Sequence, residues 1–131
     1  MQKLDLSIII PAFNEAQSIP QLYNLITDKL SEKLLSYEVI FIDDGSNDDT
    51  WKEMEKITIS DKKVKAIKFS KNYGKSDALD AGFKESEGDY ILTLDADFKE
   101  QKGVGCVRLG AALLSKAAVW NTGALWKGIV E

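Results

Sequence analysis

The chain of 131 residues contains no histidine and a single cysteine, Cys106. Without histidine, imidazole-based zinc sites and Ser-His-Asp triads are excluded. A lone thiol forms neither an internal disulfide nor a cysteine-based metal site, so a reducing compartment, the cytoplasm, is expected. Any bound metal ion must have oxygen ligands, which favours Mg²⁺ or Mn²⁺.

Positive charge is also scarce, with 17 Lys and Arg against 21 Asp and Glu and a formal net charge of −4. Nonspecific binding to nucleic acid relies on basic patches, so no nucleic-acid partner is expected. The charge is uneven along the chain. Residues 1–100 carry 13 basic and 20 acidic side chains, whereas residues 101–131 carry four and one. The change of sign indicates that the C-terminal segment differs in character from the rest.

Four short runs rich in apolar and β-branched residues recur along the chain, and each is followed by a polar loop. Three of them are almost continuously apolar, which is typical of strands buried on both faces of a parallel sheet. The third contains Lys65 and Lys68 and is expected to be partly exposed. The predicted strands are residues 6–10, 39–42, 64–69 and 90–94.

Helical patterns separate these strands. Ser18 with Gln21, and Thr50 with Glu53, match the capping-box pattern at a helix start, and Gly88 is placed to end a third helix. Helices are therefore predicted over residues 18–35, from about residues 48–50 onward, and over about residues 75–86. Alternating strands and helices predict right-handed βαβ units in one doubly wound α/β sheet.

This topology fixes where ligands bind, because open α/β sheets bind them outside the carboxyl ends of their strands. All four loops that leave those ends are polar; three carry carboxylates and one carries two lysines. We expect them to meet at one edge of the sheet. The four loops are residues 11–15, 43–48, 70–75 and 95–98.

Asp95 and Asp97 follow a predicted buried strand and lie two residues apart. If the strand geometry continues, both carboxylates point the same way, and a divalent cation bound together with phosphates relieves their repulsion. Alone, such a pair is only an acidic loop. Its place on the shared edge favours the metal site.

The second loop begins with Asp43 and Asp44. A tight turn with Gly45 at positive φ, followed by an acidic helix start, explains Gly45, Asp48 and Asp49. It does not explain the first two carboxylates, and Asp44 is a candidate acceptor of hydrogen bonds from a nucleobase or ribose.

Lys75 lies where the third helix is predicted to begin, and helix N-termini attract anions. Its side chain is a candidate partner for a diphosphate, and a solvated surface lysine is the alternative. Ala78 and Gly82 are interpreted as small residues that allow close packing of the helix on the sheet.

The ordered set of motifs resembles the family 2 inverting glycosyltransferases, which have a GT-A fold. The Asn-x-Gly-Lys element is similar to the dolichol-phosphate mannosyltransferase-like branch, which includes bacterial polyprenyl-phosphate glycosyltransferases. The resemblance covers about residues 4–98. The motifs are Ile10-Pro11-Ala12-Phe13-Asn14-Glu15, Asp43-Asp44-Gly45-Ser46 with Asp48 and Thr50, Lys71-Asn72-Tyr73-Gly74-Lys75 with Ala78 and Gly82, and Leu94-Asp95-Ala96-Asp97.

The resemblance implies transfer of a sugar from a UDP- or GDP-sugar to a lipid phosphate, with membrane association of the full-length relatives at the cytoplasmic face. It also implies that Mg²⁺ or Mn²⁺ stabilises the leaving diphosphate. The implied nucleoside contacts are Pro11, Phe13, Glu15, Ile42 and Asp44; Asp95, Ala96 and Asp97 would contact the diphosphate, with Asp95 and Asp97 at the metal as catalytic residues and Lys75 nearby.

The family pattern is lost after Phe98, where the acceptor-side half of the fold would begin. We therefore expect a nucleotide-sugar-binding half-domain over residues 1–99 and a divergent tail over residues 100–131, as in a truncated or frame-shifted reading frame. Residues 109–130 are long enough to span a membrane, but Lys116, Asn121 and Lys127 interrupt them. A weak amphipathic helix is the favoured interpretation.

Two alternatives keep the α/β fold and change the function. A signalling receiver domain has a similar length and clustered aspartates, although receivers place an acidic pair after the first strand, where this chain has residues 11–15. The other alternative is a non-catalytic remnant that binds nucleotide, with an open sheet edge and exposed apolar surface.

Overall fold

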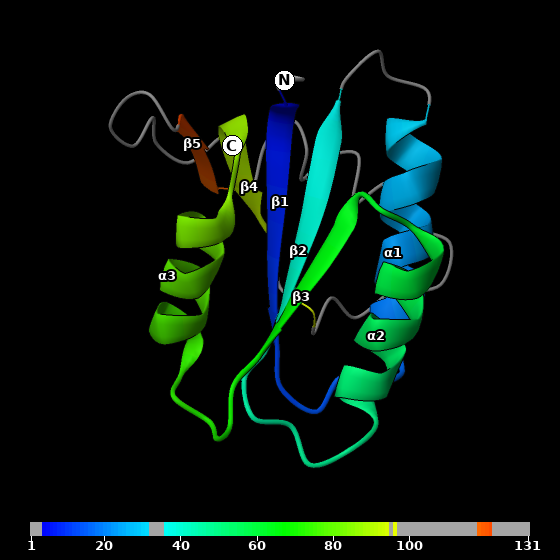
Figure 1. The fold of residues 1–131 in the computed structure, drawn as a ribbon, viewed down its shortest axis with the longest axis vertical. Coiled ribbons are helices and arrows are strands. Elements are labelled where there is room, and N and C mark those ends of the chain that lie inside the picture. The colour runs from blue at the N-terminus through cyan, green and yellow to red at the C-terminus, as the bar shows by residue number, and fades with distance from the viewer. Residues whose placement is uncertain (1–3, 32–35, 95, 97–117, 122–131) are drawn as a thin grey trace.

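A computed structural model describes residues 4–31, 36–94, 96 and 118–121. Its sheet has the order β3-β2-β1-β4-β5, in which β1 to β4 are parallel and β5 runs antiparallel to β4 (Figure 1). The predicted doubly wound α/β fold is thus confirmed. The elements are β1 (Leu4–Ala12), α1 (Ser18–Leu30), β2 (Tyr37–Asp43), α2 (Thr50–Ser60), β3 (Val64–Lys68), α3 (Lys75–Glu85), β4 (Gly88–Thr93) and β5 (Ala118–Asn121).

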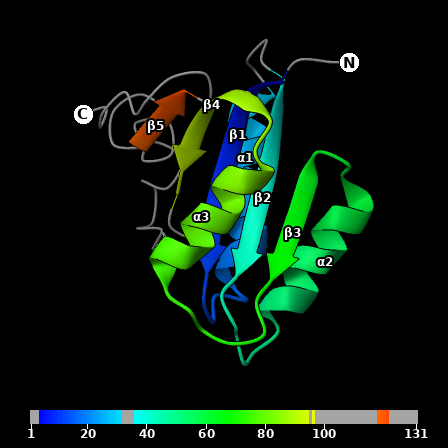
Figure 2. The same cartoon turned by 60° about the vertical axis from the view of Figure 1, so that its left-hand side comes forward.

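Helices cover both faces of the sheet, and Figure 2 shows α3 in front of it and α1 behind it. Successive residues of β1 point to opposite faces, so Ile8 and Ile10 pack with α1 and α2, whereas Ile9 packs under α3. Gly82 lets α3 approach closely, because a Cβ there would lie 2.5 Å from Cγ2 of Ile9. The predicted packing role of Gly82 is confirmed. The edge strand β3 is partly exposed, as its lysines predict.

Both predicted capping boxes are wrong. No side-chain cap is formed at either helix start, where Gln17 and Asp49 hold the N-cap positions. The hydroxyl of Ser18 donates instead to Oε1 of Glu15 at 3.3 Å, and that of Thr50 donates to a carboxylate of the second loop. In both cases the hydroxyl bonds to a carboxylate that precedes it in the chain, and not to a backbone N–H of its own helix.

The ends of two helices also differ from the prediction. Gly88 does not end α3, which stops at Glu85, but begins β4, where it pairs with Leu4. The helix α1 ends at Leu30 with Ser31 as its C-cap, and residues 32–35 of the predicted range lie outside the described residues.

The predicted amphipathic helix over residues 109–130 is wrong at residues 118–121. These four residues form β5, in which Trp120 pairs with Ile91 of β4. Val and Trp favour strands, and an unpaired edge of a sheet offers hydrogen bonds that an isolated helix cannot use. This pairing also covers the β4 edge that the remnant alternative left open. The remainder of the predicted helix lies outside the described residues.

In the part of the chain that the structure describes, no helix is both long enough and apolar enough to cross a membrane.

Candidate functional site

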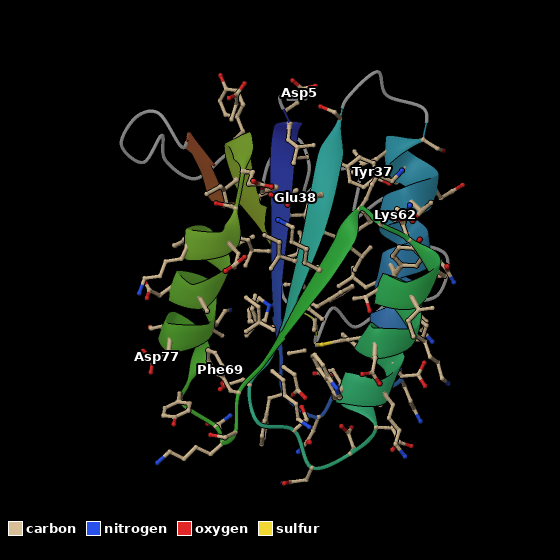
Figure 3. The ribbon with its side chains drawn as sticks, viewed as in Figure 1. Asp5, Tyr37, Glu38, Lys62, Phe69 and Asp77 are labelled. Atoms are coloured by element: carbon tan, nitrogen blue, oxygen red, sulfur yellow. The ribbon has the colours of Figure 1, made fainter. Side chains whose placement is uncertain are left out.

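Three of the predicted loops and Ala96 of the fourth meet at the carboxyl edge of the sheet, where Phe69 and Asp77 lie, whereas Glu38 lies toward the amino edge (Figure 3). Residues from all four loops line one cavity of about 370 Å³. Because the lining residues come from all four loops, the predicted convergence is confirmed. The volume of the cavity is in the range of small-molecule sites. The described lining residues are Pro11, Ala12, Phe13, Glu15, Asp44, Asn72, Gly74, Lys75 and Ala96.

The second and third loops are joined through the carboxylate of Asp44, which is only 5% exposed. Its Oδ1 accepts a hydrogen bond from the backbone N–H of Tyr73 at 2.8 Å. Its Oδ2 accepts from the N–H of Gly74 at 3.0 Å and from Nδ2 of Asn72 at 3.1 Å. A carboxylate offers about four acceptor positions, so about one, on Oδ1, is left for a ligand.

Gly45 allows this close approach of the two loops. Its φ of +75° lies in the left-handed region, as predicted, and a Cβ there would lie 2.2 Å from the carbonyl carbon of Lys71. A side chain at this position would push the third loop away from Asp44.

The first loop is joined to the second through Asn14. Its φ is +54°, in the left-handed region, which asparagine tolerates better than most residues. Its N–H donates to Oγ of Ser46, and its Oδ1 accepts from the N–H of Asn47, both at 2.8 Å. The backbone N–H of Glu15 donates to Oγ1 of Thr50, and that of Ala16 donates to Oδ2 of Asp48. The first, second and third loops are thereby held together by hydrogen bonds within the protein.

The cavity combines a cationic end with an aromatic wall. Lys75 is the first residue of α3, whose N-terminus faces the cavity through Gly74. The N–H groups of a first helical turn and the helix dipole attract anions. Phe13, which is 43% exposed, supplies an aromatic ring on the first loop. A ligand with an anionic part and a planar part suits this arrangement.

Six of the nine predicted site residues line the cavity: Pro11, Phe13, Glu15, Asp44, Lys75 and Ala96. Ile42 is the one described residue of the predicted set that does not line the cavity. It is fully buried in the cluster under α3 and is absent from the cavity wall. Successive residues of β2 point to opposite faces of the sheet, and Ile42 lies on the face that α3 covers. Asp95 and Asp97 lie outside the described residues.

The sequence prediction missed Asn72 as a site residue, although it lines the cavity and contacts Asp44. An asparagine two residues before Gly74, in a loop expected beside an acidic loop, was the available signal. Among the described residues, no three acidic, histidine or cysteine side chains gather as metal ligands. A metal site therefore stays a prediction that depends on Asp95 and Asp97.

Most of the chain is similar in sequence to part of a longer transferase. The undecaprenyl-phosphate 4-deoxy-4-formamido-L-arabinose transferase of Proteus mirabilis is 40% identical over 94 residues, which are 71% of this chain and 29% of that protein. The chain thus spans less than a third of that relative's length.

Solved structures of similar fold include S. aureus TarS 1–349 in complex with UDP-GlcNAc (TM-score 0.61, 26% identity, 72% of this chain and 27% of that one). Another is glucosyl-3-phosphoglycerate synthase from Mycobacterium tuberculosis in complex with Mn²⁺, UDP and glucosyl-3-phosphoglycerate. Its TM-score is 0.57 at 25% identity, over 72% of this chain and 34% of that one. The sequence pattern of "Glycosyl transferase family 2" matches residues 7–103, and the chain belongs to this family.

Proposed function

We propose that the cavity binds the nucleoside diphosphate of a sugar donor and that the protein transfers the sugar to a polyprenyl phosphate. The observation that carries the proposal is the meeting of four loops around one cavity at the carboxyl edge. Family membership argues against the receiver alternative. Because the chain spans less than a third of its Proteus relative, donor binding and transfer need separate tests.

The nucleoside is assigned to the wall formed by Pro11, Phe13, Glu15 and Asp44. The ring of Phe13 offers a face for stacking, and the remaining acceptor position of Asp44 suits a ring N–H of a base. Uracil and guanine carry such a ring N–H, whereas cytosine and adenine carry a lone pair at the corresponding position. The expected donor is therefore a UDP- or GDP-sugar, and the TarS neighbour was solved with UDP-GlcNAc.

The diphosphate is assigned to the part of the cavity at the N-terminus of α3 and Lys75. Asp95 and Asp97 would hold Mg²⁺ or Mn²⁺, and Ala96, which separates them in the sequence, lines the cavity. Oxygen ligands of this kind fit both ions, and one similar structure contains Mn²⁺. When bound, the ion would stabilise the negative charge of the departing nucleoside diphosphate.

The transfer proposed is a single displacement with inversion. A phosphate oxygen of the acceptor forms a bond to the anomeric carbon while the bond to the diphosphate oxygen breaks. A phosphate monoester has a second pKa of about 6, so the acceptor is already anionic at neutral pH and needs little help from a base. The name of the Proteus relative, an undecaprenyl-phosphate transferase, supports a polyprenyl-phosphate acceptor, and we propose that the reaction takes place at the cytoplasmic face of a membrane.

Isothermal titration calorimetry with UDP and GDP, with and without Mn²⁺, tests donor binding. We expect binding of one of the two that requires the metal and that Asp97→Ala weakens at least about tenfold, a loss of about 1.4 kcal/mol. Asp49→Ala is the matched control, since Asp49 is exposed and does not line the cavity. Absence of metal-dependent binding would contradict the proposal, as would binding that Asp97→Ala leaves unchanged.

A further inference from the structure

Three consecutive backbone amides at the end of the first loop donate to side-chain oxygens of the second loop and of the first residue of α2. Residues 14–16 donate, in order, to Oγ of Ser46 at 2.8 Å, Oγ1 of Thr50 at 2.9 Å and Oδ2 of Asp48 at 3.4 Å. Pro11 and Ala12 of the first loop are buried, but Phe13 and Asn14 beyond them are exposed, so the outer part of the loop makes few apolar contacts. Its conformation therefore depends on these polar contacts.

Two of the three acceptors depend on Asp48. Its Oδ1 accepts the backbone N–H of Thr50 at 2.9 Å and also the Thr50 hydroxyl. A hydroxyl has one hydrogen, so donation to Asp48 turns the lone pairs of Oγ1 toward the N–H of Glu15. Thr50 is fully buried, which leaves no water to replace a lost partner.

A favourable interaction of Asp48 with the dipole of α2 does not by itself explain these contacts. That interpretation predicts equivalent roles for Asp48 and Asp49 at the start of α2. Asp49 holds the N-cap position without a side-chain cap, and its carboxylate pairs with the exposed Lys52 at 3.6 Å. Asp48 instead contacts a buried hydroxyl and the amide of Ala16 on another loop.

We infer that Asp48 is a positioning residue, which acts through Thr50 to hold the first loop in place. This loop itself contributes Phe13 and Glu15 to the cavity wall. The inference rests on the proposed function only in that nucleotide binding is one of its readouts. Asp48 does not itself line the cavity, so its effect on a ligand is indirect.

The test compares Asp48→Ala with Asp49→Ala in the full chain. Loss of a charge-assisted hydrogen-bond network is expected to weaken the nucleotide Kd about tenfold in Asp48→Ala, measured by calorimetry with UDP or GDP and Mn²⁺. Asp49→Ala is expected to bind as the wild type does. Thr50→Val is expected to weaken binding similarly. Thr50→Ser, which keeps the hydroxyl, is expected to bind as the wild type does. Circular dichroism verifies that each variant is folded.

A double-mutant cycle separates positioning from general destabilisation. If Asp48 acts through the first loop, Asp48→Ala and Phe13→Ala together should weaken Kd by clearly less than the product of their separate effects. Independent effects that multiply would overturn the inference.

Hydrogen exchange of the Glu15 amide provides a readout without nucleotide. Its protection should fall in Asp48→Ala and Thr50→Val and persist in Asp49→Ala and Thr50→Ser. Unchanged protection in Asp48→Ala would overturn the inference even if binding were weakened. If the wild type binds neither nucleotide, the proposed function fails, and exchange still decides the role of Asp48.

Discussion

Asp44 combines a structural role with its proposed role in binding. Asp44→Asn would replace one carboxylate oxygen by an NH₂ group facing donors from residues 72–74. A buried group without its partner costs about 1–3 kcal/mol, so we expect the free energy of unfolding in urea to fall by that amount. Nucleotide affinity should fall as well. Asp49→Asn, at an exposed position, is the control, and equal stability of the two variants would contradict this account.

The ionisation of Asp48 makes the contact between the first two loops depend on pH. Burial alone would raise the pKa of this carboxyl, but hydrogen bonds from Thr50 and Ala16 outweigh it and hold the pKa below its ordinary value of 3.8. A carboxyl whose pKa is lowered by folding contributes stability above its unfolded value, and this contribution is lost as pH falls through the folded value.

The stability difference between the wild type and Asp48→Ala should therefore be full above about pH 5 and shrink below about pH 4. Urea unfolding measured at a series of pH values checks this expectation. A difference that grows as the pH falls would contradict it, because that is the behaviour of a group whose pKa is raised.

At the scale of the elements, a buried polar cluster joins the starts of three strands at the amino edge. Glu38, which is 3% exposed, accepts from the Ser7 hydroxyl at 2.6 Å and the Glu87 N–H at 2.7 Å. Nζ of Lys65 lies 3.0 Å from its other oxygen, and the Ser7 hydroxyl accepts from the N–H of Gly88. The cluster fixes the register of β1, β2 and β4.

Removing this cluster should separate stability from binding. Glu38→Ala leaves a buried hydroxyl and a backbone N–H without their acceptor, so we expect a loss of about 3 kcal/mol in the free energy of unfolding. Nucleotide Kd should stay within about twofold of the wild type, because the cluster lies away from the cavity. A large change in Kd of the folded variant would show that the two edges are coupled.

The elements were predictable from the sequence wherever the signal was local. Apolar periodicity located the four parallel strands and three helices, and the position of Gly45 in a turn indicated its positive φ. The capping box at Thr50 failed because its hydroxyl donates to Asp48 and accepts from the N–H of Glu15, 35 residues away. Glu38 was missed for the same reason, since its partner Ser7 lies 31 residues away. The sequence also did not reveal that Ile42 packs in the cluster under α3 and stays off the cavity wall, because its position in a strand does not say which face it occupies.

At the scale of the whole molecule, the parallel order β3-β2-β1-β4 brings four separate loops to one edge, and a ligand that touches all four should stabilise the fold. A ligand at 100 times its Kd adds about 2.7 kcal/mol, which corresponds to roughly 10 °C in Tm for a domain of this size. We therefore expect UDP or GDP with Mn²⁺ to raise Tm by this order in a thermal shift measurement.

The same measurement tests how the base is recognised. CDP carries a ring lone pair where UDP carries an N–H, and this lone pair would face the carboxylate of Asp44. At equal concentration with Mn²⁺, CDP should therefore raise Tm less than UDP, and Asp44→Ala should remove most of the difference between them. Because both ligands carry the same diphosphate, the difference reports on the nucleoside wall alone. Equal shifts with UDP and CDP in the wild type would show that Asp44 serves only to hold the third loop.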